Sequence, residues 1–164
     1  MLDGAPAVVE DSGGGEILVA VDASADGEWV YFDFDGARAV VVSDPFTEPT
    51  WDLAFQRFRV KSNGGVSGNG NVSIAALGTE DFTQDVTSES LEWRSDSGTG
   101  TRIKYAFTED GSWYRYQSRS HTLESRRQVI LVRSTEGIIY RLQMLTYYDR
   151  LLLSGYPTFR YARS

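Results

Sequence analysis

Residues 51–60 read WDLAFQRFRV, and KSNGG follows at residues 61–65. Trp51, Leu53 and Phe55 alternate with polar or small residues along this stretch. Because successive side chains of a β-strand point to opposite faces, the alternation predicts a half-buried strand. We expect these three side chains to share one buried face of a central strand. The Asn-Gly-Gly triplet that follows is a turn signal, since glycine tolerates positive φ.

Further strand-like runs precede this stretch. Apolar or alternating residues occupy 16–21, 28–34 and 37–42, and Asp-Gly pairs separate these runs. Asp-Gly is a hairpin signal because tight hairpin turns need the backbone conformation that glycine adopts freely. The N-terminal third therefore predicts antiparallel hairpins. The Gly-rich residues 1–15 that precede them are interpreted as a flexible lead or linker.

Strand-like runs separated by turn signals continue in the second half of the chain. A short strand is expected over residues 72–77. A short helix is expected over residues 79–85, which open with Thr-Glu-Asp. A closing edge strand is expected over residues 155–163. Two more hairpins are expected around the turns at 110–111 and 136–137, namely 102–107 with 113–117 and 128–133 with 138–148.

These patterns predict one all-β domain over residues 16–164. We expect an antiparallel two-sheet sandwich with at most one or two short helices. The Gly-rich residues 64–70 lack the Lys-Ser/Thr of a phosphate-binding loop. We interpret them as a mobile loop, with contact to a ligand as the alternative.

The composition excludes several classes of function. The chain has 164 residues and a net charge of −7, which disfavours binding to nucleic acid. It has no cysteine and one histidine, so neither a cysteine-based metal site nor a two-histidine site fits within one chain. No apolar run approaches the ~20 residues of a transmembrane helix.

The sequence gives little support for nucleophilic catalysis. Ser118 and Ser120 flank His121, but neighbouring side chains in a strand point apart, and no Gly-x-Ser-x-Gly motif is present. We therefore expect a protein that is not an enzyme. A hydrolase built on two carboxylates stays open as an alternative, because any of the 23 Asp and Glu residues could meet in space.

One stretch combines aromatic, basic and metal-ligating side chains. Aromatic rings can stack on a flat ligand, guanidinium groups pair with carboxylates, and an imidazole can bind a metal ion. An exposed histidine on a solvated, arginine-rich face is the simpler interpretation. The candidate ligand-binding residues are Tyr114, Tyr116, Arg119, His121 and Arg126, with His121 as the metal ligand. Met144 shares its strand face with apolar residues, so we expect it to pack in the core.

Several segments together resemble the HmuY-like proteins, and the resemblance spans roughly residues 30–159. The matching segments are WDLAFQRF at 51–58, VKSNGGVSGNG at 60–70, Trp113-Tyr114, SHTL at 120–123, and Glu136-Gly137 followed by YRLQMLTYYD at 140–149. The resemblance implies a β-rich fold and an exported, usually lipid-anchored surface protein of Gram-negative bacteria. The lipid anchor is expected to lie outside the present chain.

The best-known HmuY-like proteins are haemophores. They clamp haem between two axial side chains, a histidine pair or a methionine pair, and serve an outer-membrane haem receptor. The present chain has one histidine, and Met144 is its one methionine apart from Met1. The resemblance therefore implies His121 as one axial ligand, with water, a tyrosine or a second protomer completing the site.

Two hypotheses follow for the function. The first is an exported, non-enzymatic binding protein for haem or another tetrapyrrole at the bacterial surface, with Arg119 or Arg126 pairing the propionates. The second is a surface module with the HmuY fold that has lost haem binding and binds a glycan, a peptide or a partner protein.

Overall fold

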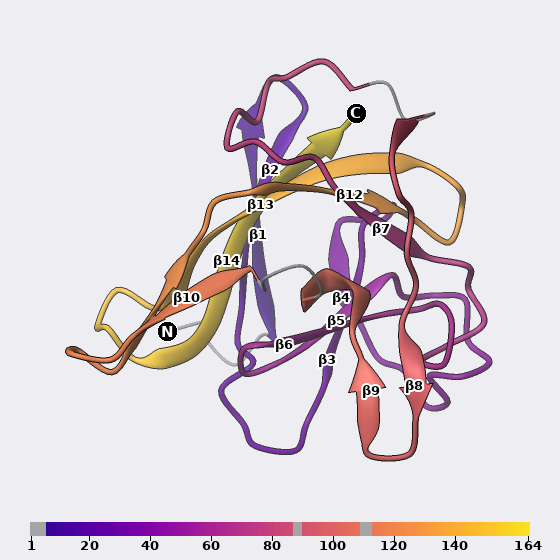
Figure 1. Ribbon diagram of the computed structural model, residues 1–164, viewed down its shortest axis with the longest axis horizontal. Helices are drawn as coiled ribbons and strands as arrows, with labels where there is room; N and C mark the ends of the chain where they lie inside the picture. The colour runs from indigo at the N-terminus through magenta and orange to yellow at the C-terminus, as the bar shows by residue number, and fades with distance from the viewer. Residues whose placement is uncertain (1–5, 87–89, 109–112) are drawn as a thin grey trace.

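The computed structural model describes residues 6–86, 90–108 and 113–164, and it is almost entirely β-structure (Figure 1). The larger sheet has six antiparallel strands, in the order β1 (Ala7–Gly13), β2 (Glu16–Val21), β14 (Ser154–Arg163), β13 (Ile139–Tyr148), β12 (Val129–Arg133) and β7 (Ser73–Ala76). The smaller sheet has four, in the order β4 (Arg38–Val40), β3 (Val30–Asp33), β5 (Leu53–Gln56) and β6 (Arg59–Ser62).

Two separate hairpins complete the fold. One pairs β8 (Ser97–Thr99) with β9 (Arg102–Lys104), and the other pairs β10 (Tyr114–Gln117) with β11 (Thr122–Ser125). The one described helical element is the short 3-10 helix η2 (Ala106–Thr108). The predicted all-β, two-sheet class is confirmed. Among the described residues, no helix has the length and apolar character needed to cross a membrane.

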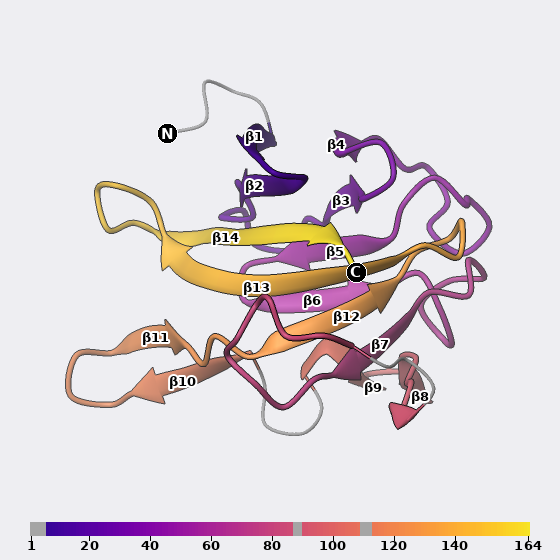
Figure 2. The same ribbon diagram turned by 90° about the horizontal axis from the view of Figure 1, so that it is seen from above.

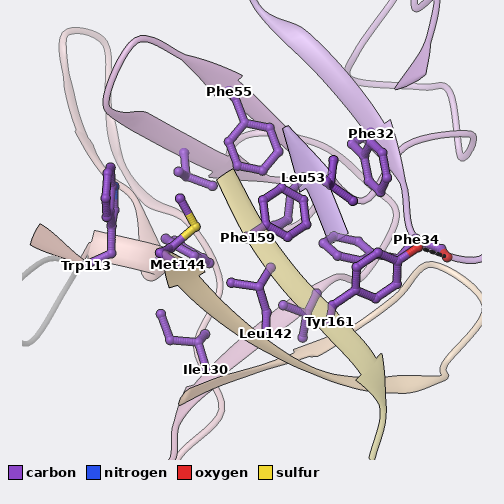
Figure 3. Packing of buried hydrophobic residues seen from close by; sticks show 14 of the residues in the cluster. Phe32, Phe34, Leu53, Phe55, Trp113, Ile130, Leu142, Met144, Phe159 and Tyr161 are labelled. Carbon is purple, nitrogen blue, oxygen red and sulfur yellow. Dashed lines mark hydrogen bonds between the residues drawn. The ribbon is translucent and has the colours of Figure 1, made fainter. Parts of the chain in front are cut away.

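The hydrophobic core lies between the two sheets and is rich in aromatic rings (Figure 3). Phe159 of β14 stacks on Phe55 of β5 with ring centroids 5.4 Å apart, and it also contacts Phe32 of β3 edge-on. Met144 of β13 points into the same core and is 1% exposed, which confirms its predicted packing role. The core therefore holds the two sheets face to face. Because the Met144 side chain is packed within it, its sulfur is not accessible as a metal ligand.

The strand expected over residues 51–60 is instead a hairpin. Chain reversal occurs after Gln56, with Arg57 in the left-handed region at φ 54°. The Arg57 guanidinium donates to the Ser24 carbonyl and to the Ser154 hydroxyl, so contacts distant in sequence hold a turn that has no glycine. The prediction of one continuous strand was wrong because no local turn residue marks this reversal.

Trp51 departs from the predicted shared face. Leu53 and Phe55 enter the main core, whereas Trp51 is equally buried but packs edge-on against Tyr31, with centroids 4.9 Å apart. The Lys61 ammonium lies over the Trp51 ring. The burial of all three residues is confirmed, and their placement on one face is not.

Three other expectations also need correction. The lead expected over residues 1–15 is ordered from Ala7 on, because β1 forms an antiparallel ladder with β2. The expected edge strand β14 is central, since it pairs with β2 on one side and β13 on the other. The helix expected over residues 79–85 is a turn, in which the Asp81 side chain accepts the Thr83 N–H that a helix would pair with the Thr79 carbonyl.

The hairpin expected from residues 102–107 and 113–117 does not form. Residues 102–104 pair with residues 97–99, and residues 114–117 pair with residues 122–125. The turn proposed at Asp110-Gly111 lies outside the described residues. The hairpin joining β12 and β13 is confirmed.

The Gly-rich segment after β6 is anchored, in contrast to the mobile loop expected there. Asn63 donates to the Trp51 carbonyl at 2.9 Å and accepts from the Gly70 N–H at 3.1 Å. Gly65 has φ +57°, and a Cβ there would lie 1.9 Å from the Asp96 carbonyl oxygen. This close backbone approach requires glycine, so the segment is a structural junction.

Candidate functional site

The β10–β11 hairpin carries the candidate residues and extends from one end of the molecule (Figures 1 and 2). In its register, Tyr116 lies opposite Leu123 and Tyr114 lies opposite Ser125, so these four side chains share one face. The Leu123 N–H donates to the Tyr148 hydroxyl at 2.9 Å, and the Ser125 hydroxyl donates to the Met144 carbonyl at 2.6 Å. These bonds fix the hairpin against β13.

His121 lies in the turn of this hairpin. Its φ is +53°, a left-handed conformation that histidine adopts more readily than most residues. The exposed imidazole forms a 2.9 Å hydrogen bond between Nδ1 and the Tyr116 hydroxyl. Among the described residues, no hydrogen bond reaches Nε2. A metal-binding histidine characteristically has its second ring nitrogen hydrogen-bonded, so the arrangement suits coordination through Nε2.

Arg126 lies at the opposite end of the hairpin from His121. Its Nε donates to the Tyr114 carbonyl at 3.0 Å, and its backbone N–H donates to the Trp113 carbonyl at 2.9 Å. Arg119 lies in the exposed turn near His121 and makes no hydrogen bond or ion pair within the described part of the chain. The structure thus links Tyr116 with His121 and Tyr114 with Arg126, as two separate pairs.

A pocket of about 430 Å³ opens at the base of the hairpin. Ligand pockets commonly measure about 300–1,000 Å³, so this one can hold part of a medium-sized ligand. Arg115 and Arg126 line it from the hairpin side, and Trp113, Phe107 and Ile130 contribute apolar surface. The sequence indicated Arg126 as a candidate ligand-binding residue. Phe107 and Ile130 were missed because only the tertiary fold brings η2 and β12 to this hairpin.

A second polar cluster lies away from the hairpin. Carboxylate oxygens of Asp33, Asp35 and Asp52 lie within 4.8 Å of one another, close enough to hold a cation. Burial raises the pKa of Asp52 to about 6, although the N–H groups of Phe34 and Thr135 donate to its carboxylate. These bonds show that Asp52 connects β5 to two other segments, which gives the cluster a structural role.

The fold and the hairpin define a two-sheet β domain with an exposed imidazole and a pocket lined by charged and apolar residues. The family model of the HmuY protein matches residues 25–161. The chain therefore belongs to the HmuY family. No curated protein sequence matches the chain.

Solved structures share the fold over nearly their whole length. A Bacteroides vulgatus protein, provisionally described as an HmuY-like haem-binding protein, superimposes with a TM-score of 0.71 at 17% identity, covering 96% of this chain and 97% of that one. A Bacteroides fragilis protein, provisionally described as a lipoprotein, gives 0.68 at 18% identity, with 99% and 96% covered. The apo HmuY analogue of Tannerella forsythia gives 0.65 at 11% identity, with 97% of each chain covered.

Proposed function

We propose that the chain is an exported, non-enzymatic binding protein that takes haem or a related tetrapyrrole at the β10–β11 hairpin. One observation carries the proposal. The His121 imidazole is exposed with Nδ1 held by the Tyr116 hydroxyl, in a domain of the HmuY family. The description of the Bacteroides vulgatus neighbour as an HmuY-like haem-binding protein supports the choice of ligand.

The residues of the hairpin fit haem through one axial ligand. Haem would supply an iron ion, which the His121 Nε2 atom can coordinate, and two propionates, which Arg119 or Arg126 can pair. Met144 cannot supply a second ligand because its side chain is packed between the sheets. Water, a tyrosine or a second protomer then completes the coordination. We expect the ferric spectrum to be high-spin or mixed and to shift when added imidazole fills the sixth position.

The family and one neighbour support a proposed cellular role. The Bacteroides fragilis neighbour is provisionally described as a lipoprotein, which supports a place at the bacterial surface. We propose that the chain acts at the outer membrane or in the periplasm and passes haem to an outer-membrane receptor.

A haem titration monitored at the Soret band tests this function. We expect the wild type to bind with modest affinity and His121→Ala to lose most of that affinity, while Ser118→Ala, an exposed change in the same turn, behaves as wild type. Raising the salt concentration should weaken binding somewhat, because the propionate–arginine pairs are screened. Tight low-spin binding that survives His121→Ala would show that the axial-ligand assignment is wrong. If added haem gives no change in the Soret band with either the wild type or His121→Ala, haem is not the ligand.

A second candidate function rests on the pocket alone. Arg115 and Arg126 can pair the carboxylate of a glycan or peptide. Glu80 and Glu92 of the same pocket can accept hydrogen bonds from its hydroxyl or amide groups. His121 is not among the lining residues. A uronic-acid oligosaccharide provides a probe for calorimetry. Binding that is lost in the Arg115→Ala/Arg126→Ala double variant and unchanged in His121→Ala would favour this function, and absence of binding would count against it.

A further inference from the structure

The turn between β13 and β14 exposes three consecutive leucines. Leu151, Leu152 and Leu153 are 73%, 80% and 52% exposed. Isolated exposed apolar side chains are ordinary, whereas a contiguous apolar patch commonly marks a contact surface. We propose that this leucine turn, residues 151–153, inserts into the interface of a lipid bilayer.

The leucine turn has a defined conformation. One carboxylate oxygen of Asp149 accepts hydrogen bonds from the N–H groups of Leu151 and Leu153, both at 2.9 Å. The Asp149 carbonyl accepts from the Leu152 N–H, and the Asp149 N–H donates to the Leu153 carbonyl, both at 3.0 Å. Leu152 has φ 63°, a conformation that is strained for a leucine. The fold therefore maintains a strained backbone in order to present these side chains outward.

The backbone hydrogen bonding of this turn is compatible with contact to lipid. All three leucine N–H groups are satisfied within the turn itself. Turns in water-exposed loops commonly satisfy N–H groups in the same way, as Asp44 does for the Phe46 N–H, so this bonding permits contact with lipid without selecting it. In hydrocarbon each unsatisfied N–H is costly, so a segment that enters lipid must satisfy these groups internally.

The surroundings of the leucine turn also match a membrane interface. The turn is a convex projection at the end of a long hairpin (Figures 1 and 2), a shape that a fluid bilayer accommodates without a matching cavity. Next to the leucine turn, Tyr148, Tyr156 and Arg150 line a mainly apolar groove of about 530 Å³, which also includes the acidic residues Glu10 and Asp149. Tyrosine and arginine side chains prefer the headgroup level, with an apolar part toward lipid and a polar end toward water. The order from leucine tip to tyrosine and arginine follows the polarity profile of a bilayer surface.

Phosphatidylcholine vesicles test the proposal. A zwitterionic lipid is chosen because the net charge of −7 would repel anionic vesicles. We expect the wild-type chain to float with vesicles at millimolar lipid, and the Leu151→Gln/Leu152→Gln double variant to lose about tenfold or more in partitioning. Phe46→Gln is the matched control, because Phe46 is also exposed but lies in a different loop. Unchanged thermal unfolding of all three proteins shows that partitioning is compared between folded chains.

A fluorescent variant tests insertion separately. In Leu152→Trp, fluorescence difference spectra against the wild type should shift to shorter wavelength with vesicles, and brominated acyl chains should quench the added signal. Absence of flotation, or flotation that the double variant retains, would overturn the proposal. A wild-type dimer that the double variant dissociates would also overturn it, since the leucines would then contact a second copy.

Discussion

The segment from Trp51 to Val72 and the β10–β11 hairpin have opposite characters. The first contains the residues by which the chain most resembles the HmuY-like proteins, and more than half of its residues are buried. Asp52, Asn63 and Asp96 connect it to neighbouring strands through backbone N–H and carbonyl groups. The second is exposed and carries the candidate ligand residues. The segment that is recognisable as belonging to the family therefore builds the frame, while the candidate ligand residues lie on an extension of it.

The largest stability loss is expected at the centre of the frame. Phe55→Ala should lower the free energy of unfolding by about 3–5 kcal/mol, because Phe55 is fully buried and stacked on Phe159. Phe46→Ala, at a 59% exposed position, should change it by less than about 0.5 kcal/mol. Urea denaturation measures both values. A loss under about 1 kcal/mol for Phe55→Ala would place that strand outside the core.

The glycine junction gives the next largest effect. Gly65→Ala should cost more than about 3 kcal/mol, since its Cβ would collide with the backbone oxygen of Asp96. Gly137→Ala provides the control, because Gly137 also has positive φ (+81°) but faces open space. That variant should lose only about 1–2 kcal/mol. Similar losses in the two variants would mean that conformational strain, and not the close approach to Asp96, requires the glycine.

The buried carboxylate of Asp52 predicts a pH dependence of stability. Its pKa is about 6 in the folded chain, above its ordinary value of 3.8. Between these values the folded state retains a proton that the unfolded state releases. The contribution of Asp52 to stability should therefore be fully present below about pH 4 and be lost as pH rises toward 7, by at most about 3 kcal/mol.

Asp52→Asn separates this contribution from the others. The variant loses stability overall, because an amide offers one acceptor oxygen where Phe34 and Thr135 supply two donors. Its unfolding free energy should nevertheless vary less steeply between pH 4 and 7 than that of the wild type. Identical slopes in chemical denaturation would contradict the assignment of the titration to Asp52.

The smallest stability effect is expected on the hairpin. His121→Ala and Tyr116→Phe should each change the free energy of unfolding by less than about 0.5 kcal/mol, since both side chains are exposed and bond mainly to each other. Thermal denaturation of the ligand-free proteins checks this. A loss above about 1 kcal/mol in either variant would assign the hairpin a structural role like that of the frame.

The sequence predicted the fold class because the strand signals are local and strong. Alternation and Asp-Gly or Glu-Gly turns located several strands, including β2 and the β12–β13 hairpin. Two reversals were missed because they lack glycine: Arg57 forms one and His121 the other, each in the left-handed region. The Arg57 turn depends on contacts with Ser24 and Ser154, which no local pattern reveals.

The candidate site was predictable in part. The residue types needed for an anionic, metal-containing ligand stand together in one stretch, and the structure places that stretch on a single hairpin. The pairing of His121 with Tyr116 follows from the hairpin register, which was not predicted because residues 113–117 were assigned to a different partner. The pocket walls come from β7, η2 and β12, so sequence proximity could not indicate them.

The most direct test of the division between frame and hairpin is NMR mapping with gallium protoporphyrin IX, a diamagnetic analogue of haem. The ¹⁵N-labelled chain would be titrated and its amide shift changes located along the sequence. We expect the largest changes within residues 113–127, little change within residues 51–72, and loss of the changes in His121→Ala. Changes concentrated within residues 51–72, or changes that persist in His121→Ala, would contradict this expectation.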